Sequence, residues 1–300
     1  MYKKIIKLAA LLAAVIALAL IIVYNRQTTL NGTDKITVSA SFYPLYEFAQ
    51  HVGGNKVAVT NITPAGAEPH DFEPTPQTLV AAQNAALFIY NGGTMEPWVA
   101  KLLPDYKHIA VKASDHIALR ANGDGSDPHF WLDPVLAQQI VINIRDGLIQ
   151  ASPNDKTYFD QNAAAYNKQL AALDSNIKSN LHTCTNRTIV TSHDAFRYYA
   201  ARYNLDVDTI AGLDPAQEPS AAKLAEISNI VKQKNITYIF FESLVSPKLA
   251  DTIAQETGAQ TAAFDPLEGL TNDAQKAGKN YISVQQDNLA ALTRALGCHE

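Results

Sequence analysis

Residues 153–182 read PNDKTYFDQNAAAYNKQLAALDSNIKSNLH, and this stretch decides how the chain is organised. Its apolar side chains recur at steps of three and four residues, which is the spacing of one face of an α-helix. They are Tyr158, Phe159, Ala163, Tyr166, Leu170, Leu173, Ile177 and Leu181. Pro153 after Ser152 is a helix-start signal. A helix of this length would span about 45 Å, and it would restrict hinge motion more than a Gly/Ser linker would.

Short apolar runs that alternate with helical patterns lie on both sides of this helix, which is typical of βαβ units and parallel sheets. The runs before it are 36–42, 57–62, 87–90 and 109–111. The runs after it are 188–192, 209–211, 238–242 and 261–264. We therefore expect an α/β protein with two lobes, each with a four-stranded, mainly parallel sheet flanked by helices. The predicted parts are an N-terminal lobe at 35–150, a linking helix at 151–183 and a C-terminal lobe at 184–300.

The composition is that of an ordinary globular protein, with 300 residues, 47% hydrophobic and 18% charged. This length is comfortable for two lobes. The formal net charge is −5, so the chain lacks the dense basic footprint of proteins that bind phosphate backbones. We do not expect a nucleic-acid partner.

The N-terminal 27 residues have the pattern of an export signal. Three lysines within the first seven residues precede an apolar run at 8–24, and polar residues follow at 25–27. The run would measure about 25 Å as a helix, at the short end of a bilayer span, with its basic flank in the cytoplasm. Ala17-Leu18-Ala19 fits a cleavage site, but cleavage there would leave an apolar terminus. We therefore favour an uncleaved signal anchor at 1–27, followed by a polar stalk at 28–34; a cleaved chain would be secreted or periplasmic.

Two cysteines, Cys184 and Cys298, are present. An even pair in an exported chain favours a disulfide, although two separate thiols are the alternative. Neither cysteine lies within the first 183 residues, so no cysteine follows the apolar run to carry a lipid. Their wide separation is also unlike the short spacing of zinc thiolate sites.

Two histidines before the predicted long helix stand in distinctive surroundings. His70 lies in the Pro-rich block PAGAEPHDFEPTP at 64–76, where prolines limit the backbone and would preorganise a ligand. The alternative is a connecting loop with an exposed histidine. His129 lies in DPHFWLDP at 127–134, where Asp133 and Pro134 read as the N-cap and first residue of a helix. Phe130 and Trp131 would form a dry wall beside a bound ion, or would simply seal the base of the helix.

Three further candidates lie at the ends of predicted strands in the C-terminal lobe, where ligands of open α/β sheets collect. They are His193, Glu242 and Asp265. Asp265 could instead be a turn residue before Pro266, and Glu242 could be a buried partner for a lysine or a backbone amide.

Together these residues offer three imidazoles and one or two carboxylates at loop mouths. Three nitrogens and one oxygen suit tetrahedral Zn²⁺, whereas shells richer in oxygen suit Mn²⁺. Zinc is therefore the expected ion, with manganese as the alternative. We expect solvated or capping roles for the histidines in polar or helical surroundings, which are His51, His108, His182 and His299.

At these blocks the sequence resembles the ABC-transporter substrate-binding proteins for zinc and manganese, the ZnuA and TroA-like family. The matching stretches, in family order, are GAEPHDFEPTP at 66–76, DPHFWLDP at 127–134, SHDAF at 192–196 and FDP at 264–266. The resemblance implies two lobes joined by a long helix with metal in the cleft between them. It also implies metal ligation by His70, His129, His193 and Asp265, with Glu242 orienting a ligand or a solvent molecule. Manganese members often carry Glu at the third position, so His193 favours zinc.

The expected function is capture of Zn²⁺ outside the membrane and delivery to an ABC permease and its ATPase, by a monomer that is not an enzyme. The alternatives are a Mn²⁺-specific member of the family, a metal-dependent adhesin and a zinc hydrolase. A carboxylate as fourth ligand argues against the hydrolase, because catalytic zinc keeps an open position for water. The sequence also lacks His-Glu-x-x-His and Gly-x-Ser-x-Gly motifs.

Overall fold

The computed structural model describes residues 35–122 and 125–299. The predicted signal anchor at 1–27 and the stalk at 28–34 lie outside the described residues. Among the helices that the structure does describe, none is long and apolar enough to cross a membrane.

The first sheet is four-stranded and entirely parallel, in the order β2-β1-β3-β4. Its strands are β1 (Ile36–Ala40), β2 (Val57–Asn61), β3 (Leu87–Tyr90) and β4 (Ile109–Lys112). Helices cover both faces of this sheet. Successive side chains of a strand point to opposite sides, so neighbouring residues of β3 pack against different helices. Leu87 and Ile89 pack into the cluster that includes α2 (Tyr43–Gly53) and α5 (Pro134–Ala151). Phe88 packs against residues of α3 (Pro76–Gln83) and α4 (Val99–Leu102).

The second sheet repeats this plan, in the order β10-β9-β7-β8, again all parallel. Its strands are β7 (Thr188–Thr191), β8 (Asp206–Thr209), β9 (Tyr238–Phe241) and β10 (Gln260–Ala263). One face carries α7 (Arg197–Tyr203) and α11 (Tyr281–Ala295), and the other carries α8 (Ala221–Gln233) and α9 (Lys248–Thr257). The short α10 (Asn272–Lys276) precedes α11. Two four-stranded parallel sheets are therefore confirmed.

One predicted strand was misplaced. The run at 209–211 was predicted, whereas β8 occupies Asp206–Thr209. This strand lies at the edge of its sheet and contains Val207 as its single large apolar residue between two aspartates. An edge strand needs little apolar surface. The apolar run in this region is therefore formed by the buried Ile210 and Ala211, which follow β8.

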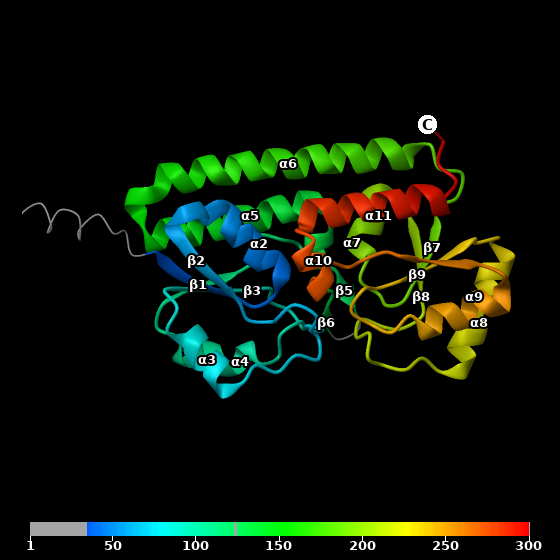
Figure 1. The fold of residues 1–300 in the computed structure, drawn as a ribbon, viewed down its shortest axis with the longest axis horizontal. Helices are drawn as coiled ribbons and strands as arrows, with labels where there is room; N and C mark the ends of the chain where they lie inside the picture. The colour runs from blue at the N-terminus through cyan, green and yellow to red at the C-terminus, as the bar shows by residue number, and fades with distance from the viewer. Residues whose placement is uncertain (1–34, 123–124, 300) are drawn as a thin grey trace, which may run out of the picture. The chain divides into compact units, whose positions relative to one another are not determined.

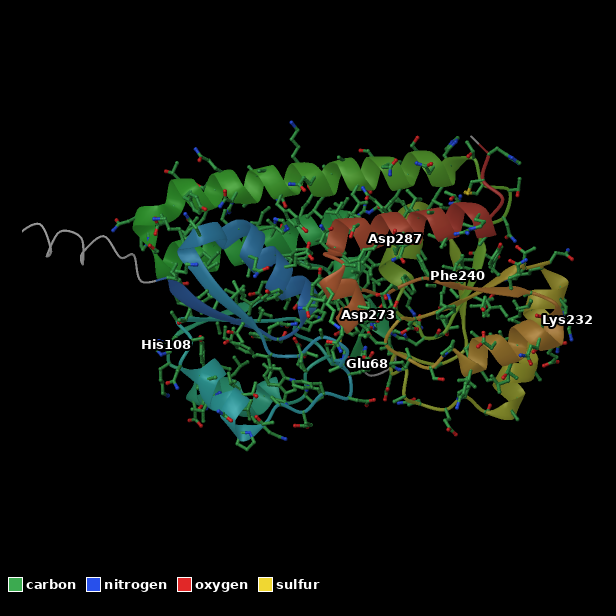
Figure 2. All side chains as sticks on the ribbon, viewed as in Figure 1. Glu68, His108, Lys232, Phe240, Asp273 and Asp287 are labelled. Atoms are coloured by element: carbon green, nitrogen blue, oxygen red, sulfur yellow. A yellow bond between two sulfur atoms is a disulfide. The ribbon has the colours of Figure 1, made fainter. Side chains whose placement is uncertain are left out.

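The predicted long helix is confirmed as α6 (Lys156–His182), preceded by the 3₁₀ turn η4 (Pro153–Asp155). Seven of the eight residues of the predicted apolar stripe are buried, and Tyr158 is partly exposed. Figure 1 shows α6 running past both sheets, with α5 and α11 beside it. Its buried face joins α2, α5 and α11 into a single apolar cluster that also includes side chains from both sheets. Side chains fill the space between these helices and the strands (Figure 2).

Three further 3₁₀ turns lie within the described residues, at η1 (Gly54–Lys56), η2 (Leu103–Asp105) and η3 (Phe130–Leu132). The polar stretch at 120–127 contains two short antiparallel strands, β5 (Ala121–Asn122) and β6 (Gly125–Ser126). Residues from Ile36 onward form one unit, so the lobe boundaries near 150 and 184 stay predictions.

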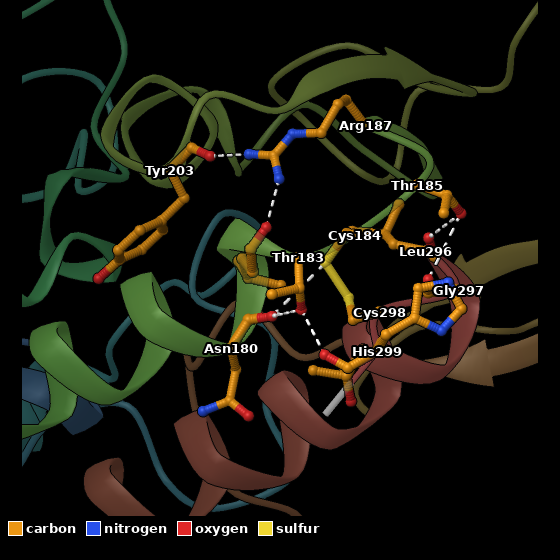
Figure 3. Close-up of a disulfide and its surroundings, with 12 residues drawn as sticks. Asn180, Thr183, Cys184, Thr185, Arg187, Tyr203, Leu296, Gly297, Cys298 and His299 are labelled. Carbon is orange, nitrogen blue, oxygen red and sulfur yellow. Dashed lines mark hydrogen bonds between the residues drawn. A yellow bond between two sulfur atoms is a disulfide. The ribbon is translucent and has the colours of Figure 1, made fainter.

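The predicted disulfide between Cys184 and Cys298 is confirmed in the structure (Figure 3). The two cysteines also form a β-bridge between the segment after α6 and the segment after α11. Beside them, the Thr183 hydroxyl donates to the His299 carbonyl. The disulfide thus fastens the end of α11 to the end of the long helix.

Candidate metal centre

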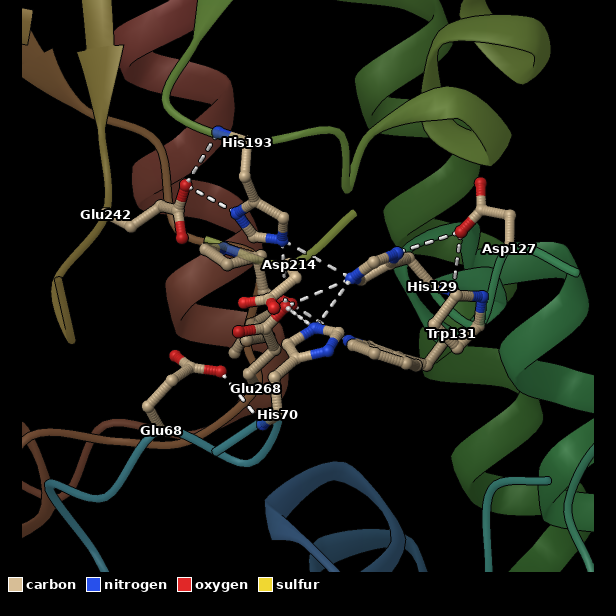
Figure 4. A network of polar contacts seen from close by, with 12 residues as sticks. Glu68, His70, Asp127, His129, Trp131, His193, Asp214, Glu242 and Glu268 are labelled. Atoms are coloured by element: carbon tan, nitrogen blue, oxygen red, sulfur yellow. Dashed lines mark hydrogen bonds and ion pairs between the residues drawn. The ribbon is translucent and has the colours of Figure 1, made fainter. Parts of the chain in front are cut away.

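Four side chains meet at one point between the two sheets: His70, His129, His193 and Glu268. Their ligand atoms all lie within 4.8 Å of one another. The His129 Nε2 atom is 3.2 Å from that of His70 and 3.3 Å from that of His193. The Glu268 Oε1 atom lies 3.4 Å from Nε2 of His70 and 3.2 Å from each of the other two Nε2 atoms. Figure 4 shows the three rings converging on this carboxylate.

Each of the four residues follows the carboxyl end of a parallel strand. His70 comes after β2 and His129 after β4, while His193 comes after β7 and Glu268 after β10. The carboxyl ends of parallel strands share one edge of a sheet, and loops at that edge form the binding crevice of open α/β folds. The two sheets therefore each contribute two residues to the cluster.

The separations fit a tetrahedral zinc site. Five of the six edges between the four ligand atoms measure 3.2–3.4 Å. A regular tetrahedron with edges of about 3.3 Å has its centre about 2.0 Å from every vertex, which is the usual Zn–N and Zn–O bond length. The residues present thus match both the donor set and the size that zinc requires.

Two of the histidines are fixed by a carboxylate behind the ring. Asp127 Oδ1 lies 2.8 Å from Nδ1 of His129 and accepts a hydrogen bond from its backbone N at 3.0 Å. Glu242 Oε1 makes the same pair of contacts with His193, at 2.6 and 3.2 Å. A carboxylate on Nδ1 keeps the proton there and leaves the Nε2 lone pair directed at the cluster centre.

The charges of the cluster strongly perturb its titration. Burial by itself would lower the pKa of His193, but the charges of Glu242 and Glu268 raise it well above the usual value. The pKa of His129 is also raised, because its contacts with Asp127 and Glu268 outweigh the effect of burial. Burial would raise the pKa of Glu268, yet the charge of His193 and the three imidazole contacts hold it well below the usual value. Without metal, the site therefore holds protons on imidazole and negative charge on Glu268.

His70 is bonded differently. Its side chain is 9% exposed, whereas those of His129 and His193 are fully buried. Its backbone N donates to Glu68 Oε1 at 3.2 Å. Burial and the charge of Glu268 raise the pKa of Glu68 to about 9, so this carboxyl group carries a proton at neutral pH in the metal-free cluster.

The structure places Asp265 outside this group, and Glu268 supplies the carboxylate in its stead. Asp265 Oδ1 accepts from the backbone N of Leu267 at 2.7 Å, which is the turn role left open as the alternative. The backbone of Leu267 has a φ of 56°, in the left-handed region. This turn brings Glu268 rather than Asp265 to the histidines.

Sequence reasoning missed Glu268, Asp127 and Glu68. A local signal was available for the last two, because both histidines that follow strands of the first sheet come after an acid–Pro pair, Glu68-Pro69 and Asp127-Pro128. In each case the acidic side chain accepts from the backbone N of the histidine two residues later. The predicted aromatic side chains do lie beside the site. Phe130 and Trp131 are fully buried, and the Trp131 ring centre lies 5.2 Å from that of His129.

Comparison with known proteins agrees with this fold and site. Residues 38–295 match the family described as zinc-uptake complex component A, periplasmic, and the chain belongs to this family. The resemblance inferred from the four sequence blocks is thereby confirmed.

Two curated relatives show the extent of the similarity. The zinc-binding lipoprotein AdcA of Streptococcus pneumoniae is 40% identical over 304 residues, which cover 95% of this chain and 60% of AdcA. The chain thus spans about three fifths of the length of that relative. The high-affinity zinc uptake system protein ZnuA of Bacillus subtilis is 38% identical over 281 residues, or 88% of each chain.

Solved structures share the whole fold. The Zn(II)-bound ZnuA-like domain of Streptococcus pneumoniae AdcA has a TM-score of 0.79 and 42% identity, covering 87% of this chain and 99% of that domain. The laminin-binding protein Lmb of Streptococcus agalactiae, described as a bifunctional protein with adhesin and metal-transporting activity, has a TM-score of 0.82 and 36% identity. That match covers 88% of this chain and all of Lmb.

Proposed function

We propose that this protein captures Zn²⁺ outside the membrane and delivers it to an ABC permease. The observation that carries the proposal is the cluster of three imidazole Nε2 atoms and one carboxylate oxygen, in which five of the six mutual distances are 3.2–3.4 Å and all lie within 4.8 Å. The ligands in this proposal are His70, His129, His193 and Glu268, and the ion is cargo that is bound and released unchanged.

The donor set favours zinc over manganese. Three nitrogen donors and a single oxygen form a nitrogen-rich shell, whereas Mn²⁺ prefers carboxylate, carbonyl and water oxygens. Asp127 and Glu242 occupy the Nδ1 atoms of two rings, so they orient the ligands rather than bind the ion.

The site geometry supports transport rather than hydrolysis. Four protein groups supply a full tetrahedral shell, whereas catalytic zinc commonly has three protein ligands and a water in the fourth position. The cargo must also leave, and His70, as the most exposed of the three histidines, lies nearest to solvent.

Tethering to the outer face of the cytoplasmic membrane is part of the proposal. The apolar run at 8–24 with its basic flank has the character of a signal anchor. AdcA of Streptococcus pneumoniae is named a lipoprotein, and an apolar anchor would hold this chain at the same surface without a lipid. Fractionation of cells after alkaline extraction tests this: an anchored chain stays in the membrane pellet, and a cleaved chain appears in the medium or periplasm.

The test of metal binding is elemental analysis and competitive zinc titration of the full chain, purified in detergent. His193→Ala should lose most of the bound zinc, because it removes a buried ligand. His108→Ala is the matched control, because His108 is an exposed histidine outside the cluster and is labelled in Figure 2. Equal zinc content in the wild type and His193→Ala would refute the site.

The similarity to Lmb makes adhesion a second candidate function. Growth separates the two proposals. A strain that lacks an importer subunit should grow poorly only when zinc is scarce, and added zinc should restore its growth. Unaltered growth under zinc limitation, together with lost binding to laminin, would favour the adhesin.

A further inference from the structure

The segment that carries Glu268 is held by hydrogen bonds from the segments that carry His129 and His70. We call residues 265–270 the Glu268 loop. The indole Nε1 of Trp131, two residues after His129, donates to the Pro266 carbonyl at 2.9 Å. The backbone N of Gly66, in the loop of His70, donates to the Leu270 carbonyl at 2.9 Å. Glu268 thus lies between two anchor points, and both belong to segments that carry other members of the cluster.

The start of the Glu268 loop is fixed by an asparagine of α11. Asn288 Oδ1 accepts from the Asp265 backbone N at 2.8 Å, and Asn288 Nδ2 donates to the Asp265 carbonyl at 2.8 Å. Asn288 is 3% exposed, so its amide is turned to the loop rather than to solvent. An amide is suited to this task because it offers a donor and an acceptor together.

The side chain of Asp265 then shapes the turn. Its Oδ1 atom accepts from the Leu267 backbone N at 2.7 Å, and Leu267 is a non-glycine residue with a φ of 56°. Residues with a Cβ disfavour this region, so surrounding contacts must hold it there. The hydrogen bond from Leu267 is one such contact, and Glu268 is the next residue along the chain.

We propose that Asp265 and Asn288 are positioning residues for the metal centre, which act by placing the Glu268 carboxylate against the three histidines. The inference rests on the proposed metal-binding function and assigns a task to the acidic residue of the Phe264-Asp265-Pro266 block. Glu268 Oε1 is 3.2 Å from Nε2 of both His129 and His193, and a displacement of about 1 Å is enough to disable a site of this kind.

The expected effect of Asn288→Ala is a fall in zinc affinity of roughly 10–100-fold, the range known for residues that support metal ligands. Asp265→Ala should act in the same direction. Asp265→Asn keeps an oxygen that can accept from Leu267, so it should bind zinc much more tightly than Asp265→Ala. This conservative rescue distinguishes placement of the turn from any need for the Asp265 charge.

Asn143→Ala is the matched control for Asn288→Ala. Asn143 is a buried helical asparagine whose Nδ2 donates to the backbone carbonyls of Ala113 and Asp115, at 3.0 and 2.7 Å. It therefore has the same chemistry at a segment other than the Glu268 loop. Both variants should melt at lower temperature, but only Asn288→Ala should alter the site.

The decisive experiment is a double-mutant cycle on the full chain, with chelator competition for Zn²⁺ and the visible absorption spectrum of bound Co²⁺ as readouts. Since Asn288 acts through Glu268, Asn288→Ala should weaken binding in the wild type and have little further effect in Glu268→Ala. The Co²⁺ spectrum of Asn288→Ala should shift towards that of Glu268→Ala. If Asn288→Ala does not fold, the paired comparison of Asp265→Ala with Asp265→Asn carries the test.

Two failures can be told apart. If the wild type and Glu268→Ala bind zinc equally, the proposed ligand set is wrong. If Glu268→Ala weakens binding but Asn288→Ala and Asp265→Ala match Asn143→Ala in affinity and Co²⁺ spectrum, the ligand set stands and the positioning role is refuted.

Discussion

Acidification should remove zinc from this protein at a pH closer to neutrality than the ordinary histidine pKa suggests. Zinc needs the Nε2 lone pairs of His129 and His193, so a proton on the Nε2 atom of either ring competes with the ion. The pKa values of both rings are raised in the metal-free site. The competition therefore begins above pH 6.5, the unperturbed histidine value, and grows as the pH falls.

The structure also sets the steepness of this effect. Each proton displaced by zinc changes the affinity about tenfold per pH unit, so two histidines give up to about 100-fold per unit below their pKa values. Glu268 adds nothing in this range, because its pKa is held well below the usual value and it stays ionised. The profile should thus be steep and governed by imidazole.

The assay is chelator competition between pH 5.5 and 8, with calorimetry in buffers of different ionisation enthalpy to count the protons released. Glu242→Gln provides the internal control. It removes the charge that most raises the pKa of His193 but keeps an oxygen for Nδ1, so its profile should move to lower pH. An affinity that does not change across this range, with no proton release, would refute the reasoning.

Three further predictions concern single contacts. Asp127→Ala should weaken zinc binding by roughly 10–100-fold, because it frees the His129 ring from its bond at 2.8 Å; Asp127→Asn, which keeps an acceptor, should lose less in the same competition assay. Replacing Cys184 and Cys298 by serine should lower the free energy of unfolding in urea by about 2–5 kcal/mol, since the disulfide closes a separation of 114 residues, while the zinc stoichiometry stays at that of the wild type. Leu170→Ala should lower the free energy of unfolding by about 2–5 kcal/mol, because Leu170 is fully buried on the inner face of α6. A loss below about 1 kcal/mol would show that this face of α6 is loosely packed.

Much of the fold could be predicted because burial leaves a periodic signature. The α6 stripe repeats with the helical period, and Leu87 to Tyr90 form a short apolar run because both faces of β3 are covered. The position of the edge strand β8 was predicted wrongly because Asp206 and Asp208 flank a single valine, which leaves no apolar run. Periodicity predicts elements only where the core imposes it.

The candidate site was predictable in a similar way. His70, His129 and His193 follow strands or Pro-fixed loops directly, so their shared edge could be inferred from chain order. The fourth member could not, because two acidic residues, Asp265 and Glu268, lie in one loop. The choice depends on the left-handed conformation of Leu267 and on bonds from Trp131 and Asn288. Such tertiary contacts leave no pattern in the local sequence.

The central claim is that His70, His129, His193 and Glu268 together hold zinc. Its most direct test is a crystal structure of the zinc-loaded protein, with anomalous scattering measured at the zinc absorption edge. This ligand set predicts one strong peak between the two sheets, about 2.0–2.2 Å from Nε2 of each histidine and from a Glu268 oxygen, with Asp265 still bonded to Leu267. A peak ligated by Asp265 in place of Glu268, or a peak away from the three histidines, would contradict it.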